Sequence, residues 1–337
     1  MDIDATNRAV ARMQALARAT ARPEVLADIG PFAALFRVPA GMADPVLVAS
    51  ADGVGTKVIV ARLMDVYDTV GQDLVNHCVN DILTAGAAPL FFLDYLASNA
   101  LTEDHKVALV EGVSRACRAT GCALIGGETA DMPDVYRPGE YDFAGFIVGV
   151  VERARIIDGR AIRPGDALLA LPSTGLHTNG YTLVRHLWCL GTGEDEADAR
   201  ARLARYEPDL GRTLGEALLA VHRCYLEDLR PVLPRLKGIA HITGGGLVEN
   251  VPRILPEGTA ARFHRAAWEV PPLFRLIQRA GAIPEAEMFR TFNMGLGIVL
   301  AVAPDDLQAV RDRLPDAMLV GEVVAQGTDG QRVVLDR

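Results

Sequence analysis

The first 160 residues alternate between helix-like segments and short apolar runs. Apolar positions recur at helical spacing in 7–20, 69–86 and 104–119. Between these segments lie four apolar runs of strand length, each bounded by Gly, Pro or Asp, at 45–50, 89–97, 122–127 and 143–152. The alternation predicts a sheet covered by helices, in the α/β or α+β class.

A second set of elements follows the Pro-Gly turn in "RAIRPGD" (160–166). Helices are expected from about 179 to 190, within 209–230, and from 271 and 305, with apolar strands between them and a final strand pair near 317–335. A chain of 337 residues is too long for one simple core. We therefore predict two domains, 1–160 and 161–337, the second of the α/β type.

The composition is that of a globular protein, with 50% hydrophobic and 23% charged residues. The net charge of −9 argues against a nucleic-acid partner. The N-terminal "MDIDATNRAV" lacks a secretory signal, and the longest apolar runs are half the length of a membrane span. The five cysteines form no C-x-x-C pair, as expected for buried thiols in a reducing compartment. We predict a cytoplasmic protein without a membrane partner.

The stretch "VLVASADGVGTKVIVA" (46–61) interrupts two apolar runs with chemically distinctive residues. Asp52, Gly53, Gly55, Thr56 and Lys57 place a carboxylate, bare backbone, a hydroxyl and a cation within six positions. The spacing matches neither a Walker A loop nor a dinucleotide fingerprint. Local chemistry alone leaves a plain turn and a site for phosphate and metal equally open.

Two further acidic clusters emerge from apolar elements of the first half. Asn80 and Asp81 belong to a predicted helix that ends at Gly86, and Glu128 follows the apolar "CALI" run. Asp81 by itself is most simply a solvated or capping residue. Three such clusters at the ends of apolar elements together favour one site for metal and phosphate.

The second half contains two strand–loop–helix motifs whose loops are rich in glycine and hydroxyl residues. Such a helix N-terminus is suited to binding anions. "LPSTGLHTNGYTL" (171–183) contains Thr174, His177, Thr178 and Asn179, and His177 is either an acid–base residue or a capping histidine. "HITGGGLVEN" (241–250) carries Thr243, Gly244, Gly245 and Gly246, while "TFNMGLG" places Asn293 before two glycines of a strand, which usually mark a close approach. No pattern supports serine, zinc-protease or thiol chemistry.

In this order, these segments resemble the phosphoribosylformylglycinamidine cyclo-ligases, or AIR synthetases, of purine biosynthesis. The resemblance covers roughly residues 2–335 and rests on "DGVGTK", "VNDIL…GAAPLFFLDYLA", "GGETADMP", "YDFAGFIVGVVE", "STGLHTNGYTLVR", "HITGGGLVENVPRILP" and "TFNMGLG". The spacing from Asp81 to Pro89 is shared by a wider ATP-using superfamily, whereas the complete set of motifs is specific.

The resemblance implies a homodimer in which the first halves of two subunits pair their sheets into a barrel, with ATP and Mg²⁺ in a cleft. It implies phosphorylation of the formamide oxygen of formylglycinamidine ribonucleotide, followed by ring closure through an amidine nitrogen as phosphate leaves. Lys57, Asp81 and His177 would be catalytic, and Asp52, Asp81 and Glu128 would hold the metal. The residues expected to bind ATP are Asp52, Gly53, Gly55, Thr56, Lys57, Asn80, Asp81 and Gly86. Those expected to bind the ribonucleotide are Glu128, Thr174, His177, Thr178, Asn179, Thr243, Gly244, Gly245, Gly246 and Asn293.

The chain also departs from the family pattern. The loop "LADIGPFAAL" (26–35) carries Ala27, Asp28, Pro31 and Ala33 where glycines are typical. Ala51 replaces a usual threonine, and Val221 with His222 replaces Pro-Thr. These changes leave two alternatives to an AIR synthetase: an ATP-using paralogue acting on another amide or carboxylate, and a non-catalytic nucleotide-binding paralogue.

Overall fold

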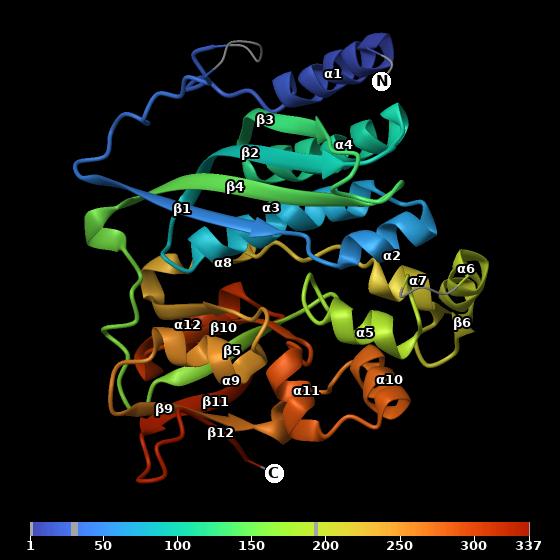
Figure 1. Ribbon diagram of the computed structural model, residues 1–337. Helices are drawn as coiled ribbons and strands as arrows, with labels where there is room; N and C mark the ends of the chain where they lie inside the picture. The colour runs from blue at the N-terminus through green and yellow to red at the C-terminus, as the bar shows by residue number, and fades with distance from the viewer. Residues whose placement is uncertain (1–2, 28–32, 192–194, 337) are drawn as a thin grey trace.

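The computed structural model describes residues 3–27, 33–191 and 195–336, so Asp28 and Pro31 of the glycine-poor loop lie outside the described residues. The chain forms two sheet-based layers, one above the other (Figure 1). The upper sheet comprises β1 (Pro45–Gly53), β4 (Tyr141–Glu152), β2 (Ala88–Ser98) and β3 (Ala123–Asp131), in that spatial order. Its pairs are antiparallel except β2 with β3, which is parallel.

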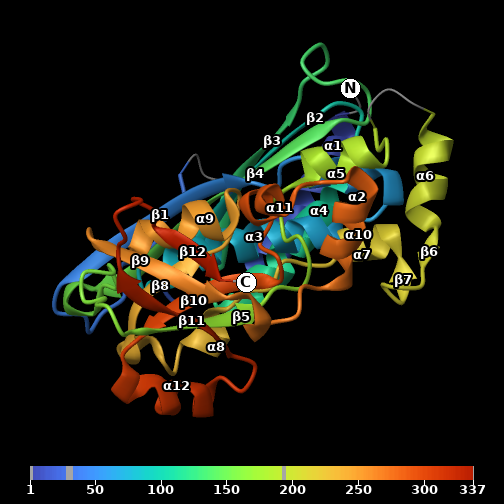
Figure 2. The same cartoon turned by 90° about the horizontal axis from the view of Figure 1, so that it is seen from below.

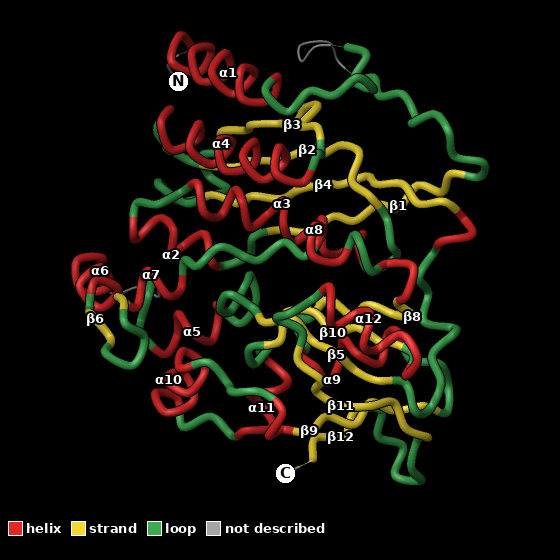
Figure 3. Tube along the Cα trace, turned by 180° about the vertical axis from the view of Figure 1, so that it is seen from behind, coloured by secondary structure: helices red, strands yellow, loops and turns green. Residues whose placement is uncertain are grey.

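Helices cover one face of this sheet. α3 (Asp68–Leu83) and α4 (Glu103–Thr120) pack against it, and α1 (Ile3–Arg18) packs on α4, as the view from behind shows (Figure 3). Two glycines allow α3 and α4 to touch. A Cβ at Gly71 would lie 2.1 Å from the Leu109 carbonyl oxygen, and a Cβ at Gly112 would lie 2.1 Å from that of Asp68. The short α2 (Lys57–Met64) follows β1 directly.

The opposite face of the same sheet carries exposed apolar side chains. Leu47 of β1 is 58% exposed and Phe146 of β4 is 46% exposed. In the antiparallel register Phe146 pairs with Ala51, so Phe146 and Leu47 share a face, since residues two or four apart in a strand point the same way. Among the described residues, the helices that contact this sheet lie on the other face, so this face has no covering helix layer (Figure 3).

The lower sheet has the order β12 (Val333–Asp336), β9 (Thr259–His264), β11 (Met318–Ala325), β5 (Ala167–Pro172), β10 (Leu296–Val302) and β8 (Leu236–His241). All seven residues of β10 are buried, because helices lie on both faces of this sheet. α12 (Leu307–Arg313) lies on one side, with α9 (Gly246–Asn250) and α11 (Glu285–Thr291) on the other (Figure 2). The remaining elements are α5 (Tyr181–Leu187), α6 (Glu196–Ala204), α7 (Leu214–Leu218), α8 (Leu226–Leu229), α10 (Pro272–Gly281), β6 (Tyr206–Glu207) and β7 (Arg212–Thr213).

The mixed α/β class predicted from the sequence is confirmed, and one predicted element differs. The helical region expected within 209–230 consists of α7 and α8 separated by an irregular segment, 219–225. Polar side chains of α3 bind the backbone of this segment: Asp73 accepts from His222 N, and Asn76 donates to the His222 carbonyl oxygen. These bonds replace the helical ones. In the part of the chain that is described, no helix is long and apolar enough to cross a membrane.

Candidate active site between the two domains

The parts of the chain built around the upper and the lower sheet are called the upper and the lower domain below. The polar residues of α3 form one stripe that faces the lower domain. Asp73, His77, Asn80 and Asp81 stand at positions i, i+4, i+7 and i+8, which lie on one face of a helix. Each of the four bonds to a residue outside α3. This face, the end of β1 and the loops that follow β5 and β8 enclose the candidate site.

Asp52 and Asp81 meet at this site although they come from different elements. Asp52 Oδ2 lies 2.7 Å from His77 Nε2, and Asp81 Oδ2 lies 3.9 Å from the same nitrogen. Ser50 donates to Asp81 Oδ2 at 2.9 Å, and His241 Nδ1 lies 2.8 Å from Asp81 Oδ1. The structure therefore brings together two of the three carboxylates expected to hold a metal.

The surroundings keep both carboxylates charged. Burial acts to raise the pKa of Asp52, but the hydrogen bond from His77 and its charge outweigh burial and lower it. Burial likewise opposes ionisation of Asp81, and the hydrogen bond with His241 and the charge of His77 lower its pKa overall. For His77 burial lowers the pKa, and the bond to Asp52 with the nearby Asp81 charge raises it above the usual value.

Glu128 is not brought to Asp52 and Asp81 within one chain. It lies on β3, which is separated from β1 by two strands, a distance of about 14 Å at the usual strand spacing. Glu128 pairs through Tyr95 and Ala144 with Gly53, the neighbour of Asp52. Side chains alternate between faces, so Glu128 and Asp52 point to opposite sides of the sheet. Glu128 instead lines a separate cavity of about 260 Å³ with Asp94 and Gly127.

Lys57 begins α2 and is completely buried. Its ammonium lies 2.6 Å from Asp73 Oδ2 and donates to the Ala220 carbonyl oxygen at 2.9 Å. Burial lowers the pKa of Lys57, against the charge of Asp73, and burial raises the pKa of Asp73 despite Lys57. In this structure Lys57 thus joins α3 to the segment 219–225 and does not line an open phosphate loop.

The neighbours of Lys57 reach toward the lower domain. Gly55 adopts φ +66°, a conformation that favours glycine. Thr56 Oγ1 lies 3.3 Å from Thr182 Oγ1 of α5, and Gly53 donates its N–H to Asp52 Oδ1. Gly86 has φ +77°, and a Cβ there would lie 3.3 Å from the Arg155 carbonyl oxygen and from the Ile157 side chain.

The loop after β5 places His177 and Thr178 against α3. Thr178 Oγ1 lies 2.6 Å from His77 Nδ1. His177 is buried at φ +60°, a backbone conformation that is strained for a residue with a side chain and concentrates at functional sites. A Cβ at Gly297 would lie 2.7 Å from His177 Cε1, so this strand glycine marks the close approach expected from the sequence.

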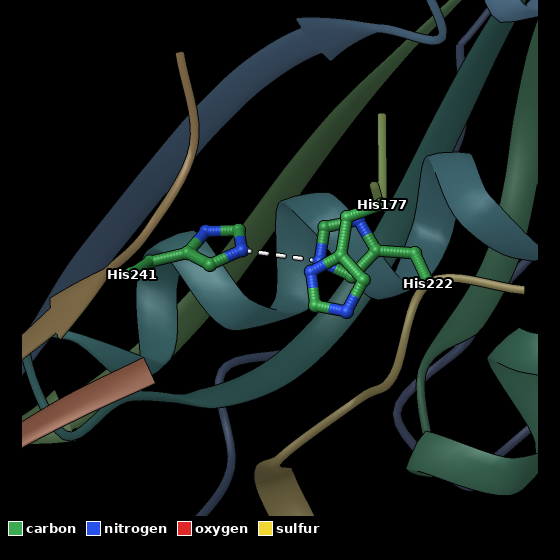
Figure 4. Close-up of side chains that lie close together, drawn as sticks. All are labelled: His177, His222 and His241. Carbon is green, nitrogen blue, oxygen red and sulfur yellow. Dashed lines mark hydrogen bonds between the residues drawn. The ribbon is translucent and has the colours of Figure 1, made fainter. Parts of the chain in front are cut away.

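His177, His222 and His241 form a buried cluster (Figure 4). The His177 and His222 rings stack at 3.9 Å between centroids, and His222 Nε2 lies 3.1 Å from His241 Nε2. Burial, with the neighbouring His241, lowers the pKa of His177 well below the usual range. Burial and the two flanking histidines do the same for His222, so both rings are neutral imidazoles at pH 7. Among the described residues, Nδ1 of each of these two rings has no hydrogen-bond partner.

Other residues expected at the site hold its loops in place. Asn80 donates to the Arg223 carbonyl oxygen and accepts from Tyr225 N. Thr174 donates to the Val221 carbonyl oxygen, and Asn293 accepts from Ser173 and donates to Gly175. These three side chains fix the geometry of segments 173–175 and 221–225.

The glycine-rich loop after β8 lies beside the loop after β5. A Cβ at Gly244 would lie 3.2 Å from Asn179 Oδ1, and Asn250 Nδ2 donates to the carbonyl oxygens of Gly244 and Gly246. Gly245 and Gly246 have positive φ. A cavity of about 480 Å³ opens next to this loop, and its lining includes Ser50, Asp81, His241, Thr243, Asn250 and Arg253.

Sequence reasoning missed His77, His222 and His241. The spacing of His77 and Asp81 as i and i+4 on a predicted helix was a usable signal. His241 opens the glycine-rich motif, and His222 stands at a position that departs from the resembled family. The meeting of these three rings with His177 had no signal in the sequence.

Comparisons with known proteins agree with this architecture. The model of the AIR synthase related protein, N-terminal domain, matches residues 32–151, and that of the C-terminal domain matches 163–334. Among solved structures, thiamine-monophosphate kinase from Stenotrophomonas maltophilia K279a has a TM-score of 0.67 at 20% identity, covering 98% of this chain and 95% of that one. Hydrogenase maturation protein HypE in complex with ATP has a TM-score of 0.67 at 17% identity, covering 98% and 90%. At such identities these two structures establish the fold alone.

The chain belongs to the AIR synthase related family. Within it, the chain is similar over nearly its full length to proteins named phosphoribosylformylglycinamidine cyclo-ligase. That of Desulfitobacterium hafniense is 49% identical over 333 residues, covering 97% of this chain and 95% of the relative. That of Sorangium cellulosum is 48% identical, covering 97% and 94%.

Proposed function

We propose that this protein is an ATP-dependent cyclo-ligase that converts formylglycinamidine ribonucleotide to aminoimidazole ribonucleotide, releasing ADP and phosphate in purine biosynthesis. The chain is similar over nearly its full length to proteins named phosphoribosylformylglycinamidine cyclo-ligase, and this similarity supports the reaction class. The observation that carries the assignment of the site is the meeting of Asp52 and Asp81 through His77, beside the glycine-rich loop at Thr243–246.

The reaction requires binding and charge neutralisation more than covalent work by the protein. ATP phosphorylates the formamide oxygen, an amidine nitrogen attacks that carbon, and the C–O bond breaks as phosphate leaves. The protein must hold the nucleophile and the electrophile together, which removes much of the entropic barrier. Thr243, Asn250 and Arg253 line the cavity and suit a ribonucleotide, because a guanidinium and a hydroxyl recognise phosphate and ribose.

The donors at Asp52 and Asp81 fit a divalent cation. Two charged carboxylates within reach of one imidazole are hard oxygen ligands that Mg²⁺ accepts. When bound, Mg²⁺ would neutralise charge on the phosphate groups. Asp52 and Asp81 would hold it, and His77 would orient both carboxylates. His177, as a neutral buried imidazole, would hold a proton at the ribonucleotide side of the site.

We also propose a homodimer formed through the uncovered face of the upper sheet. Leu47 and Phe146 expose large apolar surfaces there, and a second copy of the chain would remove them from water. By strand register Glu128 shares a face with Gly53, and therefore with Leu47. An enzyme of this reaction would act in the cytoplasm.

The test is an assay of purified protein with Mg-ATP and formylglycinamidine ribonucleotide, following ADP and the aminoimidazole product together. Equal release of both supports the proposal. ADP release without the aminoimidazole would favour a paralogue with another substrate. Absence of both, from a protein that binds ATP, would favour a non-catalytic paralogue.

A further inference from the structure

Four of the seven histidines of the chain gather at the interface between the domains, within the residues described. His77 comes from α3, His177 from the loop after β5, His222 from segment 219–225, and His241 from the end of β8. The ring centroid of His77 lies 5.3 Å from that of His222 and 5.1 Å from that of His241. Phosphoryl transfer needs carboxylates and cations, and it leaves this concentration of imidazoles unexplained.

Two of these imidazoles form a compact donor set with Asp81, and Asp52 adjoins the set through His77. One ligand atom from each of His77, Asp81 and His241 lies within 4.8 Å of the others. Asp52 Oδ2 is 2.7 Å from His77 Nε2, and Asp81 Oδ1 is 2.8 Å from His241 Nδ1. Two nitrogens and two carboxylate oxygens, from β1, from one face of α3 and from the end of β8, thus lie close together.

The outer nitrogens of both imidazoles already have partners. His77 Nδ1 faces Thr178 Oγ1 at 2.6 Å, which leaves Nε2 toward the carboxylates. His241 Nε2 faces His222 Nε2 at 3.1 Å, which leaves Nδ1 toward Asp81. Metal-binding histidines are generally oriented in this way by a bond from the second ring nitrogen.

We infer that Asp52, His77, Asp81 and His241 form a binding site for a divalent transition-metal ion of the zinc and cobalt class. Two imidazoles and two carboxylates are a set that Zn²⁺ binds in tetrahedral geometry. Mg²⁺ prefers six oxygen ligands and retains its waters, so two nitrogen donors select against it. The inference shares Asp52 and Asp81 with the cation of the proposed function, and it concerns the metal preference of the protein without ATP.

An ion can reach this site, and it would join the two domains. Asp81 and His241 line the cavity of about 480 Å³, and the Asp52 side chain is 43% exposed. Three of the donors belong to the upper domain and His241 belongs to the lower one. Binding should therefore raise the melting temperature by stabilising the interface between domains.

The experiment is a titration of the full-length, metal-free protein with Co²⁺ alone, followed by visible absorption, with Zn²⁺ and Mg²⁺ as competitors. We expect one equivalent of Co²⁺ to produce the intense bands of a tetrahedral complex. One equivalent of Zn²⁺ should abolish them, and a hundredfold excess of Mg²⁺ should leave them. His77→Gln and His241→Gln should each weaken Co²⁺ binding by roughly tenfold or more.

Matched variants decide which donors bind the ion. His264→Gln, a half-exposed histidine of β9, should bind Co²⁺ as the unaltered protein does. A substitution at the buried His241 can disturb folding, so Asp52→Asn provides a second test at a partly exposed side chain. It should also weaken Co²⁺ binding. A different result would overturn the donor set: His222→Thr loses Co²⁺ binding while His77→Gln keeps it. The ion would then be assigned to His177, His222 and His241.

Two other outcomes would overturn the inference altogether. These are equal Co²⁺ affinity in His77→Gln, Asp52→Asn and His264→Gln, and displacement of Co²⁺ by equimolar Mg²⁺. Since the titration contains no ATP or ribonucleotide, its outcome is independent of the cyclo-ligase assay. A protein that binds Co²⁺ as expected but forms no aminoimidazole would contradict only the proposed function.

Discussion

The ammonium of Lys57 lies 2.6 Å from the carboxylate of Asp73, and both side chains are completely buried. The pair joins the start of α2 to the middle of α3, and through the Ala220 carbonyl oxygen it joins both to the lower domain. The sequence pattern predicts Lys57 as a phosphate ligand, whereas this geometry makes it a buried connection between domains.

Lys57→Met is therefore expected to destabilise the protein. Removing one partner leaves the Asp73 carboxylate buried without its cation, at a cost of about 3–5 kcal/mol of unfolding free energy. The double variant Lys57→Met with Asp73→Asn should lose less than the sum of the two single changes, since neither charge is left alone. Urea unfolding of the four proteins measures this coupling. Two results would instead support a phosphate-binding role for Lys57. One is that the losses of unfolding free energy are additive, and the other is that Lys57→Met lowers ATP turnover without changing stability.

Asp81→Asn should remove most activity while keeping the fold. The change removes one negative charge from the cation site and replaces a strong ligand by a weak one. ADP release and ring closure should fall together by roughly two orders of magnitude, and raised Mg²⁺ should recover part of the rate. Steady-state assays at two Mg²⁺ concentrations test this. Asp312→Asn on the exposed side of α12 is the control, and an Asp81→Asn protein as active as that control at low Mg²⁺ would contradict the metal role.

Asp94 should make stability depend on pH. Burial raises the pKa of this carboxyl from 3.8 to about 7 in the folded protein, partly offset by a backbone hydrogen bond. A raised folded pKa means that the folded state binds the proton more tightly, so this contribution favours folding at low pH and is lost as pH rises toward 7. Between low pH and a pH above 7, the ionisation of Asp94 lowers the unfolding free energy by roughly 4 kcal/mol.

Asp94→Asn should abolish that dependence. Relative to the unaltered protein, the variant should gain unfolding free energy between about pH 4 and pH 7, by about 1.4 kcal/mol for each pH unit, because in that range Asp94 is ionised in the unfolded chain and protonated in the folded one. Urea unfolding at four pH values gives the two curves. Parallel curves would show that Asp94 ionises normally. Asp142→Asn, at an exposed position of β4, should leave the curve unchanged.

Leu47→Asp should dissociate the proposed dimer. A carboxylate on the uncovered face of the upper sheet would have to be buried against the second subunit, which costs several kcal/mol of association free energy. Leu319→Asp, an equally polar change at a 43% exposed leucine of the lower sheet, is the matched control. Sedimentation velocity should show monomers only for Leu47→Asp. Equal behaviour of the two variants would place the interface elsewhere.

The sequence by itself determined the elements and much of the chemistry at their ends. Apolar periodicity is a local property, so α3, α4 and the strands could be predicted from it, and the glycines of "DGVGTK" and "HITGGG" indicated loops that approach a ligand or another backbone. The polar stripe of α3 was also readable, because positions i, i+4, i+7 and i+8 share one helix face whatever the fold.

Only the tertiary structure decided which of these residues meet. The strand order β1-β4-β2-β3 places Asp52 and Glu128 on opposite edges and opposite faces of one sheet, although both follow apolar strands in the sequence. Packing of the two domains buries Lys57 against Asp73 and brings His241 to Asp81 across 160 residues of chain. Strand order and domain packing arise from contacts between distant segments, and no local pattern encodes them. The histidine cluster could therefore be found only in the folded chain.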